Sequence, residues 1–171
     1  FAEMTGQNLD ADTLYGLLYR KALEGAPDCG GLVSFNYDSG EHITGLETGM
    51  PLFLRPAQSE FTLENFMRAQ LYSAVSVLKL GMDILLQKEC AAADTIYGHG
   101  GLFKTAGVAQ QFLADALGAP VAVLDTAGEG GAWGAALLAG FLVYGNGRTL
   151  EEYLRQDIFC GKSGKTLAPT K

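Results

Sequence analysis

The chain carries little positive charge, and none of it is clustered. Its 12 lysine and arginine residues are outnumbered by 19 aspartate and glutamate residues, giving a formal net charge of −7 at pH 7. A nucleic acid or an anionic membrane surface is bound through a basic face that neutralises phosphates. Because the sequence supplies no such face, we expect neither a nucleic acid nor a membrane as a partner.

Cysteine and long apolar runs are also scarce. Cys29, Cys90 and Cys160 are odd in number, far apart and without the paired spacing of zinc sites or redox motifs. They predict ordinary thiols in a reducing compartment. The most apolar run, residues 132–144, is shorter than the roughly 20 residues that cross a bilayer, and no secretory signal opens the sequence. These features predict a cytoplasmic protein.

The 171 residues, of which 48% are hydrophobic, suffice for one globular domain with a core. Apolar spacing in the first half predicts two helices, and the residues between them predict two or three antiparallel strands. Thr62 is placed to cap the second and longer helix. The predicted ranges are 12–24 and 62–86 for the helices, and 30–37, 43–47 and 51–55 for the strands.

The second half alternates element types. A strand at 95–97, a helix at 105–117 and a strand at 121–124 form a β-α-β pattern, which predicts two parallel strands. The helix that begins at Ala132 is so apolar and so rich in small residues that we expect it to be covered on most sides, with Trp133 in the core. A short helix is predicted at 149–155, and residues 160–171 show no periodicity.

The segment Asp94–Thr105 contains the first of these strands and the loop that leads from it to the helix, with Gly98, Gly100 and Gly101. Glycine adopts positive φ and lets a ligand approach the backbone, so the loop and the helix start after it could hold a phosphate or nucleotide. A tight strand-to-helix turn uses the same residue types. Residue types alone leave both interpretations open.

Two widespread nucleotide-binding sequence motifs do not match this loop, and both mismatches are at Phe103. A P-loop requires glycine immediately before its lysine, and Phe103 stands there before Lys104, which we therefore interpret as a surface residue at a helix start. The dinucleotide fingerprint would need its third glycine where the chain has Phe103, and no strand-ending acidic residue is placed about 20 residues later to hold a ribose in the way usual for that fingerprint.

The acidic and histidine side chains offer few catalytic candidates. Glu129 precedes the apolar helix, where the helix dipole alone favours a carboxylate, and Asp115 is expected to bond locally. Asp125 follows a strand end, where ligands bind in α/β sheets, although a turn-forming role is the simpler interpretation. We interpret His99 as an uncharged part of the loop. His42 has no evident acidic partner, which argues against a Ser-His hydrolase.

Three motifs in order, Gly98–Leu102, Gln111–Val121 and Glu129–Ala136, resemble the C-terminal domain of the FGGY family of carbohydrate kinases. The resemblance extends from about Gly30 to Leu150. It implies an α/β fold, namely an actin-like ATPase domain with a ribonuclease-H-like mixed sheet flanked by helices. The spacing of the first two motifs is similar to the xylulokinase and ribulokinase branches, which implies a ketopentose as substrate.

The resemblance also implies a nucleotide site made of residues of the glycine loop. Gly100 and Gly101 would lie against the α-phosphate and the ribose of ATP, and Leu102, Phe103 and Ala106 would border the adenosine. Ala106 stands where many relatives place an asparagine near the adenine. Members of the family transfer the γ-phosphoryl group of ATP with Mg²⁺, largely by positioning and charge neutralisation.

In the family, the general base, the sugar pocket and the first phosphate loop precede this domain. Since Phe1 is not a start methionine, we expect residues 1–171 to be one domain of a longer protein, inactive alone and without catalytic residues or metal ligands. The sugar would be bound mainly by the N-terminal domain, and a homodimer is compatible with the sequence. A non-sugar actin-like ATPase and a non-catalytic interaction domain of the same fold remain alternatives.

Overall fold

The computed structural model describes residues 5–90, 92–125, 130–160 and 164–170. These residues form two compact units, each considered by itself below. The first contains the described residues of Phe1–Ala93 together with Asp115–Gly118, and the second those of Asp94–Ala114 and Ala119–Lys171.

Two helices that pack against each other dominate the first unit. Helix α2 (Ala11–Ala22) starts where the Asp10 carboxylate accepts a hydrogen bond from the Thr13 amide at 2.9 Å. Helix α3 (Leu63–Asp83) is capped by the Thr62 hydroxyl, which accepts from the Asn65 amide at 3.2 Å, and continues into the π-helical turn η3 (Ile84–Lys88). Both helices and the Thr62 cap confirm the prediction.

The strands of the first unit are fewer than the maximum that the sequence allows. After the 3-10 turn η1 (Cys29–Gly31), strand β1 (Val33–Phe35) pairs antiparallel with β2 (Leu52–Leu54). The strand predicted at 43–47 is wrong, because residues 42–44 form the 3-10 turn η2 (His42–Thr44), which ends at Gly45 with φ of 74°. A left-handed residue there reverses the chain instead of extending it.

A small core supports this unit. Cys29, Leu32 and Ala69 are buried together, with the aromatic ring of Phe66 packed against them. The buried side chain of Asn65 accepts from the Ala26 amide at 2.8 Å and donates to the Glu60 carbonyl at 2.9 Å, so its polar atoms are paired. Burial raises the pKa of the Cys29 thiol, which keeps this cysteine in its neutral form.

Among the described helices, the segment Leu63–Lys88 is long and apolar enough to cross a membrane by length and composition, and 22% of its most apolar window is buried. Core helices of globular proteins meet the same criteria. Within its own unit, α3 packs against α2, η1 and β1, and its buried residues Ala69, Leu71 and Val75 lie in its N-terminal two thirds.

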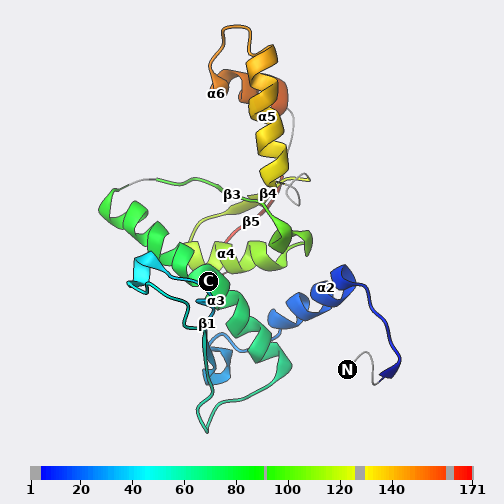
Figure 1. Ribbon diagram of the computed structural model, residues 1–171, viewed down its shortest axis with the longest axis vertical. Helices are drawn as coiled ribbons and strands as arrows, with labels where there is room; N and C mark the ends of the chain where they lie inside the picture. Colours follow the sequence, from blue (N-terminus) through cyan, green and yellow to red (C-terminus); the bar gives the residue numbers. More distant parts are fainter. Residues whose placement is uncertain (1–4, 91, 126–129, 161–163, 171) are drawn as a thin grey trace. The chain divides into compact units, whose positions relative to one another are not determined.

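The second unit contains a mixed three-stranded sheet in the order β3-β4-β5. Strand β3 (Ile96–Gly98) is parallel to β4 (Val121–Val123), and helix α4 (Val108–Leu117) connects them and lies beside the sheet (Figure 1). The predicted β-α-β unit is thereby confirmed. Strand β5 (Lys165–Leu167), antiparallel to β4, was not predicted, because three residues are too few to show a period.

Helix α5 (Gly130–Tyr144) and the pair α6 (Leu150–Tyr153) and η6 (Leu154–Ile158) lie side by side as a hairpin (Figure 1). The Trp133 ring packs edge-on against Phe159 at 5.6 Å. The expected burial of α5 is wrong: none of its residues is buried, and Leu142 is 85% exposed. Its ring contacts, to Tyr153 of α6 and to Phe159 just after η6, leave most of its apolar surface exposed.

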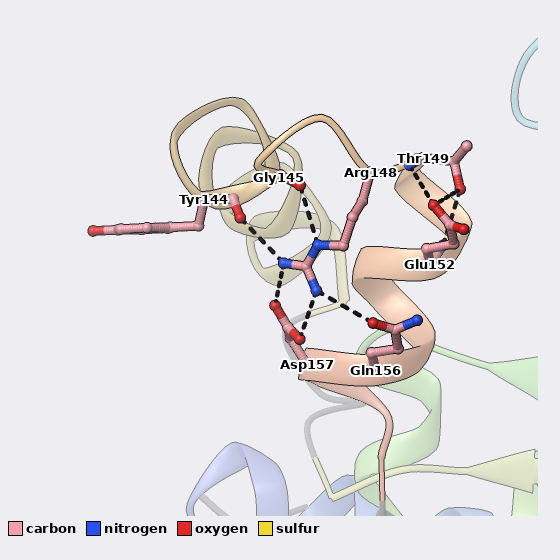
Figure 2. Close-up of polar contacts among 7 residues, drawn as sticks. All are labelled: Tyr144, Gly145, Arg148, Thr149, Glu152, Gln156 and Asp157. Carbon is pink, nitrogen blue, oxygen red and sulfur yellow. Dashed lines mark hydrogen bonds and ion pairs between the residues drawn. The ribbon is translucent and has the colours of Figure 1, made fainter.

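Arg148 holds the two arms of this hairpin together (Figure 2). Its guanidinium donates to both carboxylate oxygens of Asp157, at 3.0 and 2.7 Å, and to the carbonyls of Tyr144 and Gly145 at 3.2 and 3.1 Å. The planar fork of arginine suits this two-pronged ion pair better than lysine would. Next to it, Thr149 begins α6 with a capping box, which fixes where the second arm starts.

Acidification is expected to loosen the hairpin through this ion pair. Hydrogen bonds from Arg148 hold the pKa of the Asp157 carboxyl below its ordinary value of 3.8. A depressed folded-state pKa contributes stability that is complete above the unfolded pKa and is lost as the pH falls through the folded one. We therefore expect Asp157→Asn to flatten the drop in Trp133-monitored melting temperature between about pH 6 and about pH 3.

The control for this prediction is Asp38→Asn, which removes an exposed carboxylate in the first unit. Asp38→Asn should keep the wild-type drop in melting temperature. An equally steep drop in Asp157→Asn would show that the ion pair with Arg148 does not stabilise the hairpin.

Candidate functional site

The glycine loop of the second unit has the strand-loop-helix order that the sequence predicts. Strand β3 ends at Gly98, and Gly100 follows with φ of 112° and ψ of 174°, a conformation essentially restricted to glycine. The 3-10 turn η4 (Gly101–Lys104) comes next, with the Phe103 amide donating to the Gly100 carbonyl at 3.0 Å. Helix α4 then starts at Val108, three residues later than predicted.

Two glycines leave the surface of this loop open. A Cβ atom built on Gly100 or on Gly101 would meet no heavy atom of the described residues within 4 Å, and Gly101 is exposed. Gly101 does not have positive φ, so the loop conformation does not require glycine at that position. What the missing side chain provides at Gly101 is access to the backbone, as a phosphate-binding loop requires.

The third glycine of the loop, Gly98, has a packing role. A Cβ atom there would lie 2.3 Å from the ring of Phe103, so the ring lies directly against the end of β3. His99 packs similarly against the start of α5, since a Cβ atom on Gly130 would lie 2.6 Å from the His99 Cβ. The loop is therefore held from both sides by close contacts within its own unit.

A small cleft of about 180 Å³ adjoins the loop at the carboxyl end of β4. Phe103 and Ala106, two of the five predicted site residues, line it together with Asp125. Gly100, Gly101 and Leu102 are not on its wall, although the Gly100–Phe103 hydrogen bond ties them to it. The full lining consists of Phe103, Ala106, Gly107, Gln110, Val123, Leu124, Asp125 and Lys165.

A larger cavity of about 760 Å³ lies on the opposite face of the sheet. Tyr97, Ala122 and Thr166, which are neighbours in register on three strands, form its floor, and α6 and η6 contribute the other wall. His99 lines this cavity, but none of the five predicted site residues does. We favour the small cleft as the functional site, because it combines predicted residues, a strand end and the open backbone of the loop.

Gln110 fixes helix α4 to the sheet beside the cleft. This side chain is 3% exposed, and its amide nitrogen donates to the Val121 carbonyl on β4 at 2.7 Å and to the Lys165 carbonyl on β5 at 2.6 Å. One residue therefore ties the helix that follows the loop to two strands. The sequence motif Gln111–Val121 begins one residue later and so did not include Gln110; its Gln111 donates to the Ala168 carbonyl at 3.1 Å.

The remaining candidates lie apart from the cleft. Asp115 is an exposed residue near the end of α4, and His42 lies in η2 of the first unit. The predicted helix-capping role of Glu129 falls outside the described residues. Within the described ranges, no group of three or more His, Cys, Asp or Glu side chains could hold a metal ion.

Comparison with known proteins assigns the family. The sequence model of one protein family, the C-terminal domain of the FGGY family of carbohydrate kinases, matches residues 2–143, which is most of the chain. The chain belongs to the FGGY family of carbohydrate kinases. No curated protein sequence matches this FGGY-family chain significantly.

Solved FGGY-type kinases share the fold. Xylulose kinase from Rhodospirillum rubrum is 20% identical with a TM-score of 0.64, and the match covers 94% of this chain and 30% of that one. Gluconate kinase from Lactobacillus acidophilus is 18% identical with a TM-score of 0.66, covering 90% and 30%. Glycerol kinase from Plasmodium falciparum, solved with ADP, is 18% identical with a TM-score of 0.64, covering 90% and 29%.

These matches confirm the predicted fold class, an actin-like ATPase domain with a mixed sheet and flanking helices. They also show that this FGGY chain spans about 30% of the length of the solved kinases. The fold itself is shared by kinases named for three different substrates, so it does not select among sugars.

Proposed function

We propose that this chain is the ATP-binding, C-terminal half of a two-domain carbohydrate kinase, with residues 1–171 acting as one domain. The complete enzyme transfers the γ-phosphoryl group of ATP to a sugar hydroxyl. Membership of the FGGY family supports the reaction class. The observation that carries the nucleotide assignment is the open backbone at Gly100 and Gly101, where no atom of the residues that the structure describes occupies the space that a side chain would fill.

In this proposal the phosphates of ATP lie against Gly100 and Gly101, and the adenosine extends past Leu102 toward Phe103 and Ala106. The 3-10 turn η4 fixes the spacing between these two groups of residues. A cleft of about 180 Å³ is below the roughly 300 Å³ of a typical ligand pocket. This chain therefore encloses only part of the nucleotide, and the second domain supplies the opposite wall.

Magnesium is the expected metal of the reaction, but no ligand for it is assigned to this chain. Mg²⁺ in phosphoryl-transfer enzymes is held by one or two carboxylates, water and the substrate phosphates. In this proposal the nucleotide phosphates and the second domain would hold the ion. Bound there, it would neutralise charge on the β- and γ-phosphates.

A ketopentose such as xylulose or ribulose is our proposed substrate. The spacing between the glycine loop and the Gln111–Val121 motif, which is similar to the xylulokinase and ribulokinase branches, supports it. The residues that contact the sugar, including the general base, are proposed to belong to the other domain. We also propose that the enzyme is cytoplasmic, because its two substrates, the sugar and ATP, are both available in the cytoplasm.

The proposal predicts that the isolated chain cannot phosphorylate a sugar. Purified chain with ketopentose, ATP and Mg²⁺ should give sugar phosphate at the rate of the blank, because the chain lacks the general base and the sugar pocket. A complete xylulose kinase in the same assay is the positive control. Turnover of xylulose or ribulose by the chain alone would overturn the proposal that the general base and the sugar pocket belong to the other domain.

A further inference from the structure

The carboxylate of Asp125 is an unassigned polar group in the small cleft. Asp125 lies two residues beyond the last residue of β4, on the wall formed with Phe103 and Ala106. The side chain is exposed, and it makes no hydrogen bond or ion pair with the described residues of the chain. Asp125 therefore lines the cleft and carries an acceptor group without a partner among those residues.

The position of Asp125 is set by the sheet. Strand β4 is the central strand, paired with β3 on one side and β5 on the other, and Leu124, directly before Asp125, is 8% exposed. Gln110 adds a bridge from α4 to the two neighbouring strands β4 and β5. A carboxylate at such a strand end projects where ligands of α/β sheets bind.

The chemistry of the cleft decides which part of a nucleotide would meet this carboxylate. An ionised carboxylate only accepts hydrogen bonds, and its two oxygens suit a pair of neighbouring hydroxyl donors. It repels phosphates, which have the open glycine backbone available instead. The ring of Phe103 and the methyl group of Ala106 offer an apolar surface for a flat base.

We propose that Asp125 accepts hydrogen bonds from the ribose hydroxyls of the bound nucleotide, and so selects ribonucleotides over analogues that lack them. This inference rests on the proposed function and adds a specificity-determining residue to its site. The base lies against Phe103, the ribose at Asp125 and the phosphates at Gly100 and Gly101. The arrangement places Asp125 outside the phosphoryl-transfer chemistry, so it is a binding residue.

The test compares the affinities of the full chain for ATP and for 2′,3′-dideoxy-ATP by calorimetric titration. The wild-type chain should bind ATP about tenfold more tightly or better, the effect of hydrogen bonds to a charged acceptor. Asp125→Ala should bind both nucleotides with the affinity that the wild-type chain shows for dideoxy-ATP. Asp94→Ala removes an exposed carboxylate outside the cleft and should keep the wild-type preference.

The possible outcomes separate this inference from the proposed function. A wild-type chain that binds ATP and dideoxy-ATP equally, or an Asp125→Ala variant that keeps the preference, would overturn the ribose assignment and leave the ATP site intact. Loss of discrimination between ATP and inosine triphosphate in Asp125→Ala, with the ribose preference retained, would assign Asp125 to the base and overturn the inference. No binding of any nucleotide by the folded wild-type chain would overturn both proposals.

Discussion

Replacing Gly101 with valine should weaken ATP binding to the chain by about tenfold or more and leave its melting temperature unchanged. Gly101 is exposed and does not have positive φ, and a Cβ atom there would lie more than 4 Å from every other heavy atom of the described part of the chain outside its own neighbours. The free protein therefore has no steric reason to reject the side chain. A nucleotide seated on the loop backbone would collide with it, so the loss should appear only in binding, measured by titration with a non-hydrolysable ATP analogue.

Gly81→Val is the matched control for this prediction. Gly81 lies inside α3, also without positive φ, and its Cβ atom would make an ordinary contact of 3.5 Å with the side chain of Ile43. Valine has slightly better helix propensity than glycine, so folding should be preserved and nucleotide affinity unchanged. Equal affinities in Gly101→Val and the wild-type chain would mean that the glycine loop is only a tight turn.

Replacing Gln110 with leucine should lower the free energy of unfolding of the second unit by about 2–4 kcal/mol. The substitution keeps the apolar stem of the side chain but removes the donor that bridges the carbonyls of Val121 and Lys165. Leaving the buried Val121 carbonyl unpaired costs about 1–3 kcal/mol, and loss of the part-buried bond to the Lys165 carbonyl adds a smaller cost. Urea unfolding followed by the fluorescence of Trp133, the one tryptophan of the chain, reports on this unit.

Gln156→Leu provides the comparison. Gln156 is an exposed side chain in the same unit, and it accepts one long hydrogen bond of 3.5 Å from Arg148. Its replacement should change the unfolding free energy by no more than about 0.5 kcal/mol. A Gln110→Leu variant as stable as Gln156→Leu would show that the bridge from α4 to the strands does not hold the sheet edge in place.

Local signals made the helices and the β-α-β unit predictable. Thr62 caps α3 through its own side chain, and apolar spacing over several turns distinguishes helix from strand. The β-α-β pattern needed only two short apolar runs with a helix between them. Strand β5 gave no such signal, because it is three residues long and pairs with β4, more than 40 residues earlier in the chain.

Burial of α5 illustrates the limit of composition as a guide. An apolar helix rich in small residues predicts cover on most sides, yet no residue of α5 is buried. Its described residues make ring contacts to Phe159 and to Tyr153 of α6. Composition shows only that the surface of a helix is apolar and would be stabilised by burial. Whether the helix is buried depends on which other elements are present to cover it. The exposed Leu142 follows from that difference.

The features of the candidate site that could be predicted are those that follow directly from glycine, which allows positive φ and leaves the backbone accessible. The positive φ of Gly100 and the open backbone at Gly101 follow from the absence of a side chain. The close approach of Phe103 to Gly98, the bridge made by Gln110 and the place of Asp125 on the cleft wall could not be predicted. These features depend on how α4 packs on the sheet, and no local sequence pattern encodes that contact.

The most direct test of the central claim is calorimetric titration of the full chain with a non-hydrolysable ATP analogue in the presence of Mg²⁺. We predict saturable binding of one analogue per chain, and no heat when xylulose or ribulose is added without nucleotide. A chain that is folded by circular dichroism but shows no saturable binding up to about 1 mM analogue, near −4 kcal/mol in binding free energy, would contradict the assignment of an ATP site to this domain.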